Sequence, residues 1–406
     1  MADISKTLPL TRSSVIAAHE LVKPHIHYTP VLTNSTLTQL ASTPQTATSL
    51  TPGPWAGQQP AKPIIRLWFK CENLQKVGAF KVRGAFHALE RLCQEEGWKE
   101  GGGMERGVVT HSSGNHAQAL SLAAKQMGIP ATIVMPTIST PSKIAATKGY
   151  GSRVLFSGST SVEREAVVDE VIKETGARLV PPYDHPDIML GQGTLGIEFQ
   201  EQVEKGIASS LEQVYNNRAR KGLDAIITGC GGGGMLSGTA ISCEGTGISV
   251  FGAEPEYQGA DDCKRGLEQG KRIERVSTLT IADGLRTPVG AYPWKIISDP
   301  KFLRAMYSVT EEQIKDALRL VLERMKVVVE PSAVVPLAVA LYNEDFRKLV
   351  EKEGGEQGWD IGIVFSGGNV SLEALGKLFA VPDKQAERQE GVVGQDGKKV
   401  AENVAG

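Results

Sequence analysis

Stretches with the hydrophobic period of a strand alternate, along the middle of the chain, with stretches that have the period of a helix. Short apolar runs typical of buried strands occur at residues 64–71, 107–110, 131–135, 153–156 and 178–180. Apolar residues at helical spacing lie between the later runs, at residues 115–126, 143–147 and 162–175. This alternation predicts a parallel sheet with helices on both of its faces.

A second series of strands and helices begins near Gln192. Its strands are expected at residues 224–228, 249–253 and 361–365, and a well-patterned helix at 311–325. The fold class that we predict is therefore α/β, with two open twisted parallel sheets and flanking helices. Ligands usually bind in the cleft between two such units.

The two series also suggest domain boundaries. Residues 107–187 are expected to form a small mobile domain, and residues 1–106 together with 188–382 a large one. Residues 41–62 are rich in Ser, Thr, Pro, Gly and Gln, which predicts an exposed loop. The polar residues 383–406 predict a disordered tail.

Composition and charge narrow the class of protein. Hydrophobic residues make up 41% and charged residues 22%, as in soluble globular proteins, and the net charge of -2 favours neither nucleic acid nor an anionic membrane as partner. The five cysteines form no CxxC pair, so we expect no disulfide framework or structural zinc site, and a reducing, cytoplasmic location. The sequence shows no signal peptide and no apolar run long enough to span a bilayer.

A lysine with apolar neighbours follows the first strand-like run. Lys81 stands after Ala79 and Phe80 and before Val82, where a helical pattern begins. A lysine in apolar surroundings loses hydration of its charged form, so its pKa falls and its amine becomes a nucleophile fit for Schiff-base chemistry. From these residues alone, the alternative is a surface lysine at the start of a helix.

Four consecutive glycines, at residues 231–234, follow an apolar strand and precede a helical segment. Without Cβ atoms, their N–H groups can wrap an oxyanion, and the start of a helix adds its dipole. The stretch lacks the features of a dinucleotide fingerprint or a P-loop. It predicts a phosphate cup, and the alternative is a flexible hinge.

Two more strand ends carry polar groups. Residues 112–116, Ser-Ser-Gly-Asn-His, combine hydroxyls, an amide and free helix N–H groups, which suit a carboxylate or a ring hydroxyl; the alternative is an elaborate helix cap. Ser366 begins Ser-Gly-Gly-Asn and could hydrogen-bond a ring nitrogen, although this stretch alone indicates only a turn.

Acidic residues occur in two settings. Glu254 and Asp262 belong to one acidic loop whose oxygen ligands suit Mg²⁺ or Ca²⁺, although such loops are usually only solvated. Asp283 and Glu330 stand among apolar residues, where a buried carboxylate must be paired or functional.

Taken in order, these motifs resemble those of the fold type II pyridoxal-phosphate enzymes, and within them the branch of serine racemases and threonine dehydratases. The order is the lysine segment, Ser-Ser-Gly-Asn-His, the glycine run, Glu-Pro with Asp-Asp, Ile-Ala-Asp-Gly, Glu-Pro-Ser-Ala and Ser-Gly-Gly-Asn. The resemblance spans about residues 22–379, apart from residues 41–62.

The resemblance implies a role for each matching residue. Lys81 would hold the cofactor covalently and act as base on one face of the substrate Cα, and Ser113 would serve the opposite face. The implied cofactor contacts are Phe80, Lys81, Asn115, Gly231, Gly232, Gly233, Gly234, Met235, Glu330 and Ser366. The implied substrate contacts are Ser112, Ser113, Asn115, His116, Arg164 and Asp283. The implied ligands of Mg²⁺ or Ca²⁺ are Glu254, the carbonyl of Ala260 and Asp262.

The chain differs from the motifs of this family at several positions. The metal loop is about two residues longer, through Tyr257 and Gln258. Lys76 and Gln118 match part of a nucleotide site, but Val77 replaces a threonine there, so activation by ATP is doubtful. The biosynthetic threonine dehydratases carry a C-terminal regulatory domain, whereas this sequence ends in a polar stretch, so feedback control by isoleucine is not expected.

On this resemblance we expect a serine racemase that also catalyses α,β-elimination of L-serine-type β-hydroxy amino acids, acting as a homodimer. The alternative is a threonine or threo-3-hydroxyaspartate dehydratase, an ammonia-lyase without a racemase role. A further alternative is a β-replacement transferase such as cysteine synthase. From a different class, the chain could be a non-catalytic protein that binds a phosphorylated metabolite in the glycine cup.

Overall fold

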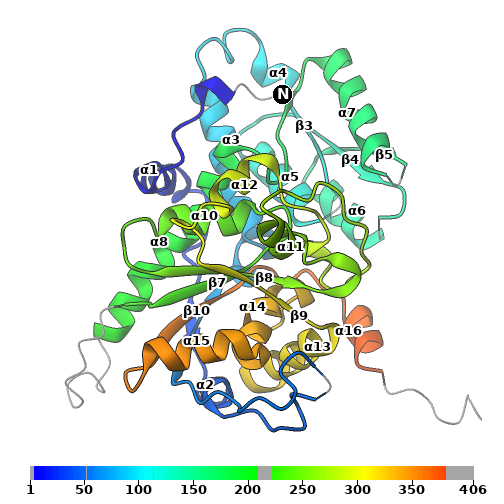
Figure 1. The fold of residues 1–406 in the computed structure, drawn as a ribbon. Helices are drawn as coiled ribbons and strands as arrows, with labels where there is room; N and C mark the ends of the chain where they lie inside the picture. The colour runs from blue at the N-terminus through cyan, green and yellow to red at the C-terminus, as the bar shows by residue number, and fades with distance from the viewer. Residues whose placement is uncertain are drawn as a thin grey trace, which may run out of the picture. The chain divides into compact units, whose positions relative to one another are not determined.

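The computed structural model describes residues 4–51, 53–112, 114–139, 141–158, 160–208 and 222–380 (Figure 1). The described residues up to Asn369 form one compact unit, and the described residues from Val370 onward form a second. In the second unit, helix α16 (Leu372–Leu378) begins at Ser371, whose hydroxyl accepts a hydrogen bond from the Ala374 amide. The tail predicted at residues 383–406 lies outside the described residues.

The first unit holds two sheets. A six-stranded sheet has the order β1-β2-β10-β7-β8-β9, and a four-stranded sheet the order β5-β4-β3-β6. All neighbouring strands pair in parallel except β1 and β2. The strands are β1 (Val31–Thr33), β2 (Ile65–Cys71), β3 (Val108–His111), β4 (Ala131–Pro136), β5 (Arg153–Ser157), β6 (Arg178–Leu179), β7 (Ala225–Gly229), β8 (Ser249–Pro255), β9 (Ala305–Val309) and β10 (Trp359–Phe365).

Helices cover the faces of both sheets, so the predicted α/β class is confirmed (Figure 1). The helices of the first unit are α1 (Arg12–Val22), α2 (Ser35–Ser42), α3 (Lys81–Gln94), α4 (Gly103–Arg106), α5 (Asn115–Gln126), α6 (Pro141–Gly149), α7 (Ser161–Thr175), α8 (Pro186–Ala208), α10 (Gly234–Ser242), α11 (Asp262–Gln269), α12 (Ala291–Ile297), α13 (Glu311–Leu320), α14 (Pro331–Tyr342) and α15 (Glu344–Gly354).

The six-stranded sheet lies between two helical layers. Helix α14 packs along β7, β8, β9 and β10, with α13 and α15 against it. Helix α10 packs on β7 and β8, and the long helix α8 packs against α10 and α3. Figure 1 shows α8 and α10 above strands β7 to β9 and α13 to α15 below them. The strands of the middle of this sheet are therefore buried on both faces, as their continuous apolar runs require.

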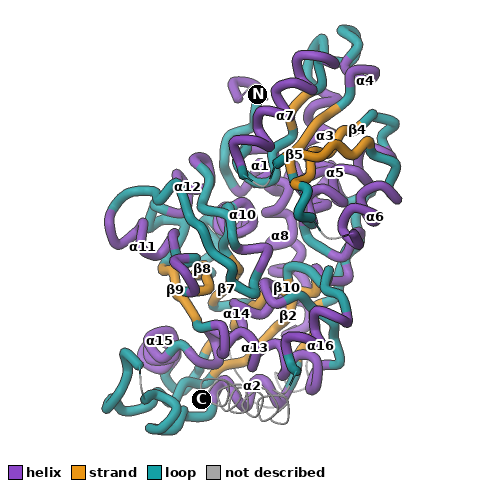
Figure 2. Tube along the Cα trace, turned by 90° about the vertical axis from the view of Figure 1, so that its right-hand side faces the viewer, coloured by secondary structure: helices purple, strands orange, loops and turns teal. Residues whose placement is uncertain are grey.

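The four-stranded sheet is covered in the same way (Figure 2). Val108 and Ile133 belong to a core cluster shared with α3 and α5, whereas the next residues, Val109 and Val134, belong to a cluster under α7. Successive side chains of a strand point to opposite faces, so both faces of this sheet are apolar and covered.

Two segments differ from the sequence prediction. Helix α8 was not predicted; its residues are buried on nearly every side, and Gly191, Gly193 and Gly196 interrupt the helical pattern. These glycines allow close packing, since a Cβ at Gly193 would overlap the backbone of Gly238 in α10. Residues 41–62 are not wholly an exposed loop, because Ala41 belongs to α2 and the side chains of Leu50 and Ala61 are buried.

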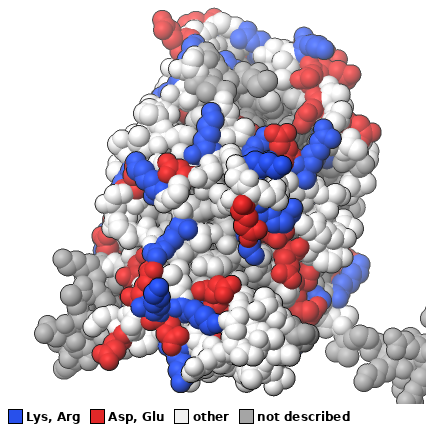
Figure 3. Space-filling model, in the orientation of Figure 1, with Lys and Arg blue, Asp and Glu red and all other residues white. Residues whose placement is uncertain are grey.

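The surface carries charges of both signs without separation, as the face in Figure 3 shows. This agrees with the net charge of -2. None of the helices in the described part of the chain is long and apolar enough to cross a membrane. All five cysteines are free thiols.

Candidate active site

The predicted motifs meet because three neighbouring strands run in the same direction. Strands β2, β10 and β7 are consecutive in the sheet and parallel, so their carboxyl ends share one edge. The Lys81 segment follows β2, Ser366 follows β10, and the glycine run follows β7. The Phe80 amide donates to the Ser366 carbonyl at 3.1 Å, which joins the first two segments directly.

Lys81 is the first residue of α3, and its amine donates a hydrogen bond to the Pro182 carbonyl at 2.7 Å. Among the described residues, no carboxylate oxygen lies within 4.0 Å of this amine. Burial lowers the pKa of Lys81 from 10.5 to about 8, because no opposite charge offsets the lost hydration. The structure therefore gives this lysine the chemical property that its apolar neighbours predicted.

If Lys81 binds the pyridoxal phosphate that the resemblance implies, its lowered pKa predicts how the cofactor-free chain recombines with this cofactor. The neutral amine is the nucleophile, and it is half populated near pH 8 rather than near 10.5. We expect the rate to rise with pH through about 8 and then to level off. Stopped-flow absorbance measures the rate, and N-acetyl-lysine, reacted in parallel, corrects for titration of the aldehyde. A rate that keeps rising to pH 10 would contradict the lowered pKa.

The glycine run forms a cradle of backbone N–H groups between β7 and α10. Gly233 adopts a left-handed conformation with φ 83°, and a Cβ there would lie 2.8 Å from Pro293. A Cβ at Gly232 would overlap the ring of Tyr183. The N–H groups of Gly231, Gly232 and Gly233 donate to no described residue. Orphan donors beside the start of a helix are suited to bind an oxyanion such as phosphate.

A side chain added to this cradle should weaken cofactor binding. We expect Gly232→Ala to lower the affinity for pyridoxal phosphate by about 10- to 100-fold, the value of one or two hydrogen bonds to a charged group. Affinity for pyridoxal, which has no phosphate, should change much less. Gly149→Ala is the matched control, since nothing lies within 4 Å of its added Cβ. Equilibrium dialysis measures the affinities of the three proteins for both ligands. Equal affinity of Gly232→Ala and wild type for pyridoxal phosphate would contradict the phosphate cup.

Asn115 connects the two sheets across this edge. Its amide donates to both carboxylate oxygens of Glu330, at 3.1 and 3.3 Å, and its oxygen accepts from Asn369 at 2.8 Å. Glu330 is buried, and burial raises its pKa to about 7, with the negative charge of Asp283 adding to the effect. Two of the implied cofactor residues, Asn115 and Glu330, are thus in direct contact.

The residues assigned to the substrate lie in different settings. Ser112 directly follows β3, and its hydroxyl accepts a long hydrogen bond, 3.4 Å, from the Gly114 amide, but no side chain caps α5. His116 is buried against the Val180 carbonyl, and burial lowers its pKa to about 3. Asp283 is exposed and forms a 2.8 Å ion pair with Lys143. Ser113 lies outside the described residues.

The arginine assigned to the substrate belongs to α7. The pKa of His111 is lowered mainly by burial, and the positive charge of Arg164 is the second-largest cause of this shift. Arg164 is therefore close to the carboxyl end of β3, where Ser112 follows.

The predicted metal ligands lie around the start of α11. Glu254 is buried, and its oxygens accept from the amides of Cys263 at 3.0 Å and Lys264 at 2.9 Å. Burial raises the pKa of Glu254 well above its usual range, and the nearby charge of Asp262 adds to this. Asp262 accepts from the Val289 amide at 3.2 Å, and Ala260 is buried.

Sequence reasoning missed Tyr183 and Pro182. They lie in the loop after β6, and Asp184 fastens this loop by accepting hydrogen bonds from the amides of Ala291 and Tyr292 at the start of α12. The Tyr183 ring lies against the glycine cradle, and burial raises its pKa to about 12. No local pattern in the sequence marks these residues, because their position depends on the meeting of segments from both sheets.

Comparison with known proteins matches residues 44–367 to the family model "Pyridoxal-phosphate dependent enzyme". The chain belongs to this family. It is 38% identical to a serine racemase of Dictyostelium discoideum, over 91% of this chain and 98% of that protein. It is 34% identical to an L-threo-3-hydroxyaspartate ammonia-lyase of Saccharomyces cerevisiae, over 91% and 96%. The crystal structure of the Dictyostelium serine racemase covers 89% of this chain and 99% of its own, with a TM-score of 0.71.

The match confirms the fold type II resemblance and makes this chain a pyridoxal-phosphate dependent enzyme. The residues at the sheet edge fit the cofactor. Lys81 supplies a desolvated amine without a carboxylate partner among the described residues, and the glycine cradle supplies N–H groups that no described residue uses. The individual contacts assigned to this group stay predictions.

Proposed function

We propose that this chain is a serine racemase that also eliminates water from L-serine and related β-hydroxy amino acids. The observation that carries the proposal is the Lys81 amine, whose pKa of about 8 allows it to exchange a proton near neutral pH. The similarity to serine racemases over nine-tenths of the chain supports the choice of substrate.

Pyridoxal phosphate, when bound, supplies an electron sink that makes the α-proton of an amino acid acidic. Lys81 then takes this proton on one face of the substrate Cα. The glycine cradle and the start of α10 hold the phosphate, and Asn115 fixes the ring orientation from the other sheet. The hydrogen bonds of Asn115 to Glu330 and Asn369 fix the orientation of its amide.

Ser113 is proposed to deliver a proton to the opposite face of Cα, which gives racemisation. Its neighbours Ser112 and Gly114 lie at the carboxyl end of β3 and the start of α5, on the second sheet. Loss of the β-hydroxyl instead of proton return gives elimination, so one site supports both outcomes. Ser366, as a neutral hydroxyl, would face the ring nitrogen without favouring its protonation.

Replacement of Ser113 by alanine separates the two outcomes. We expect Ser113→Ala to lower formation of D-serine from L-serine by about 100-fold or more, while keto acid formation falls far less, since only one of the two proton transfers is lost. Chiral chromatography and a keto-acid assay follow both products. Ser121→Ala is the matched control, because that hydroxyl is buried on α5 and bonds the Ala117 carbonyl. Equal loss of both products would contradict a separate acid on the second face.

A second candidate is a threo-3-hydroxyaspartate dehydratase. The position of the Arg164 charge near His111 favours it, because a guanidinium there could bind a second carboxylate of the substrate. The similarity to an L-threo-3-hydroxyaspartate ammonia-lyase supports it also. L-threo-3-hydroxyaspartate turned over faster than L-serine, without racemisation, would favour this candidate.

Four further features belong to the proposal. Residues 107–187 would close over the substrate as a small mobile domain and exclude water. Glu254, the Ala260 carbonyl and Asp262 would hold Mg²⁺ or Ca²⁺. The chain would form a homodimer and act in the cytoplasm. Sedimentation of the purified protein and calorimetric titration with Mg²⁺ test the dimer and the cation.

A further inference from the structure

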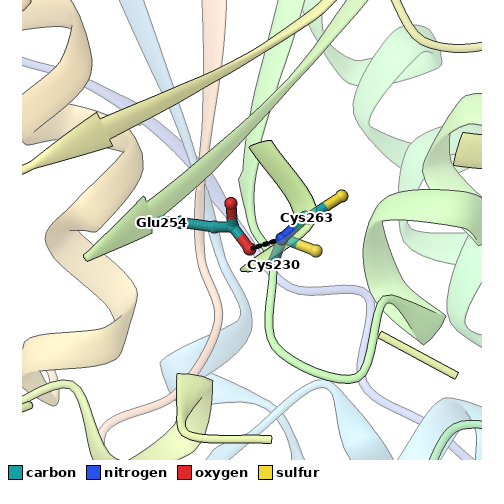
Figure 4. A group of neighbouring side chains, drawn as sticks. All are labelled: Cys230, Glu254 and Cys263. Atoms are coloured by element: carbon teal, nitrogen blue, oxygen red, sulfur yellow. Dashed lines mark hydrogen bonds between the residues drawn. The ribbon is translucent and has the colours of Figure 1, made fainter. Parts of the chain in front are cut away.

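Three side chains with metal-binding atoms meet beside the glycine run (Figure 4). Cys230 comes directly after β7, Glu254 lies near the end of β8, and Cys263 lies in the first turn of α11. Two sulfurs and a carboxylate oxygen of these residues all lie within 4.8 Å of one another. The three residues are at most 1% exposed.

The backbone fixes this arrangement. Strands β7 and β8 are parallel neighbours, and the Cys230 amide donates to the Ala253 carbonyl at 2.9 Å, so Cys230 lies beside Glu254. The Cys263 amide donates to Glu254 at 3.0 Å, which brings the start of α11 to the same point. Thirty-three positions separate the two cysteines in sequence (263 minus 230), so their spacing alone gives no sign of a metal site.

The cluster has the ligands of a soft divalent ion. Among the described residues, no lysine, arginine or histidine nitrogen lies within 4.0 Å of the Glu254 carboxylate, which is held only by two backbone amides. Thiolates select Zn²⁺ and Cd²⁺ over Mg²⁺ and Ca²⁺. Zn–S bonds of about 2.3 Å place two thiolate sulfurs on one tetrahedral ion roughly 3.8 Å apart. Since the ligand atoms here already lie within 4.8 Å of one another, small side-chain movements would bring the sulfurs to this distance.

We propose that Cys230, Glu254 and Cys263 bind one soft divalent ion such as Zn²⁺, with water as the fourth ligand. This set differs from the oxygen ligands proposed above, Glu254, Ala260 and Asp262, by its two sulfurs. Both sets use Glu254, so one chain holds either a soft or a hard ion at this point. The site adjoins the phosphate cradle, since Cys230 precedes Gly231, but its metal binding does not depend on the proposed reaction.

Titration of the metal-free holoenzyme with Cd²⁺ tests the site through the ultraviolet thiolate-to-cadmium band. We expect one ion per chain, and at least tenfold weaker binding in both Cys230→Ser and Cys263→Ser, since loss of even an outer-shell partner costs about 10- to 100-fold. Cys243→Ser is the matched control, because Cys243 is also a buried free thiol but lies at the end of α10. A band that persists unchanged in Cys230→Ser would overturn the proposal.

X-ray absorption of wild-type protein loaded with one equivalent of Zn²⁺ gives a test that does not depend on any variant folding. We expect a first shell of two sulfur and two oxygen ligands. A shell of oxygen and nitrogen alone, or one with a single sulfur, would overturn the assignment. Both measurements detect the metal directly, so a failure of the racemase proposal leaves their meaning unchanged.

Discussion

Replacing Lys81 with alanine should abolish both racemisation and elimination, with a fall in turnover of more than about 10³-fold. In the proposed mechanism Lys81 supplies both the covalent attachment of the cofactor and the base for the α-proton, and removal of a general base alone costs about 10²- to 10⁴-fold. The visible absorption of the lysine-bound cofactor should disappear as well. Activity assays with L-serine and absorption spectra of the purified variant check both expectations.

Lys99→Ala is a suitable control for this experiment, because Lys99 is an exposed lysine beyond the end of α3. It should retain wild-type activity and absorption. A Lys81→Ala protein that keeps the visible absorption and most of its turnover would show that another amine carries the cofactor.

Replacing Arg83 with methionine should destabilise the protein by about 3–5 kcal/mol, the typical result of breaking a buried ion pair from one side. Arg83 makes paired hydrogen bonds of 2.7 to 2.9 Å to Glu72 and Glu198, and none of the three is more than 1% exposed. Lys70 also bonds Glu198, at 2.7 Å, so two cations balance two carboxylates. Removal of Arg83 leaves two buried carboxylates with one cation.

Urea unfolding at a fixed cofactor concentration measures this effect. Lys315→Met is the matched control, because its partner Glu312 on α13 is exposed and Lys315 is only partly buried, so the pair should contribute less than about 1 kcal/mol. The double variant Arg83→Met with Glu72→Gln should recover part of the loss, since it removes one unpaired charge. Equal midpoints for Arg83→Met and wild type would contradict a stabilising role of the cluster.

Part of the site could be predicted because its signals are local. The apolar neighbours of Lys81 and the four glycines after an apolar strand are visible in the sequence. Each signal left an alternative open by itself, and the order of all the motifs along the chain favoured the chemical interpretation. The alternation of strand and helix predicts parallel strands, whose carboxyl ends share one edge. The adjacency of β2, β10 and β7, which brings Lys81, Ser366 and Gly231 together, is seen only in the structure.

Other parts depend on contacts that no local pattern encodes. Asn115 and Glu330 are 215 positions apart and meet only because the two sheets face each other there. Tyr183 lies against Gly232 for the same reason. Helix α8 was missed because its burial on nearly every side removes the amphipathic period by which helices are found in a sequence.

The most direct test of the racemase proposal is the fate of L-serine incubated with the purified holoenzyme in D₂O. D-serine and keto acid are followed together by chiral chromatography and mass spectrometry. We predict D-serine with solvent deuterium at Cα, accompanied by keto acid and ammonia. Keto acid without any D-serine would contradict the racemase proposal and favour a dehydratase.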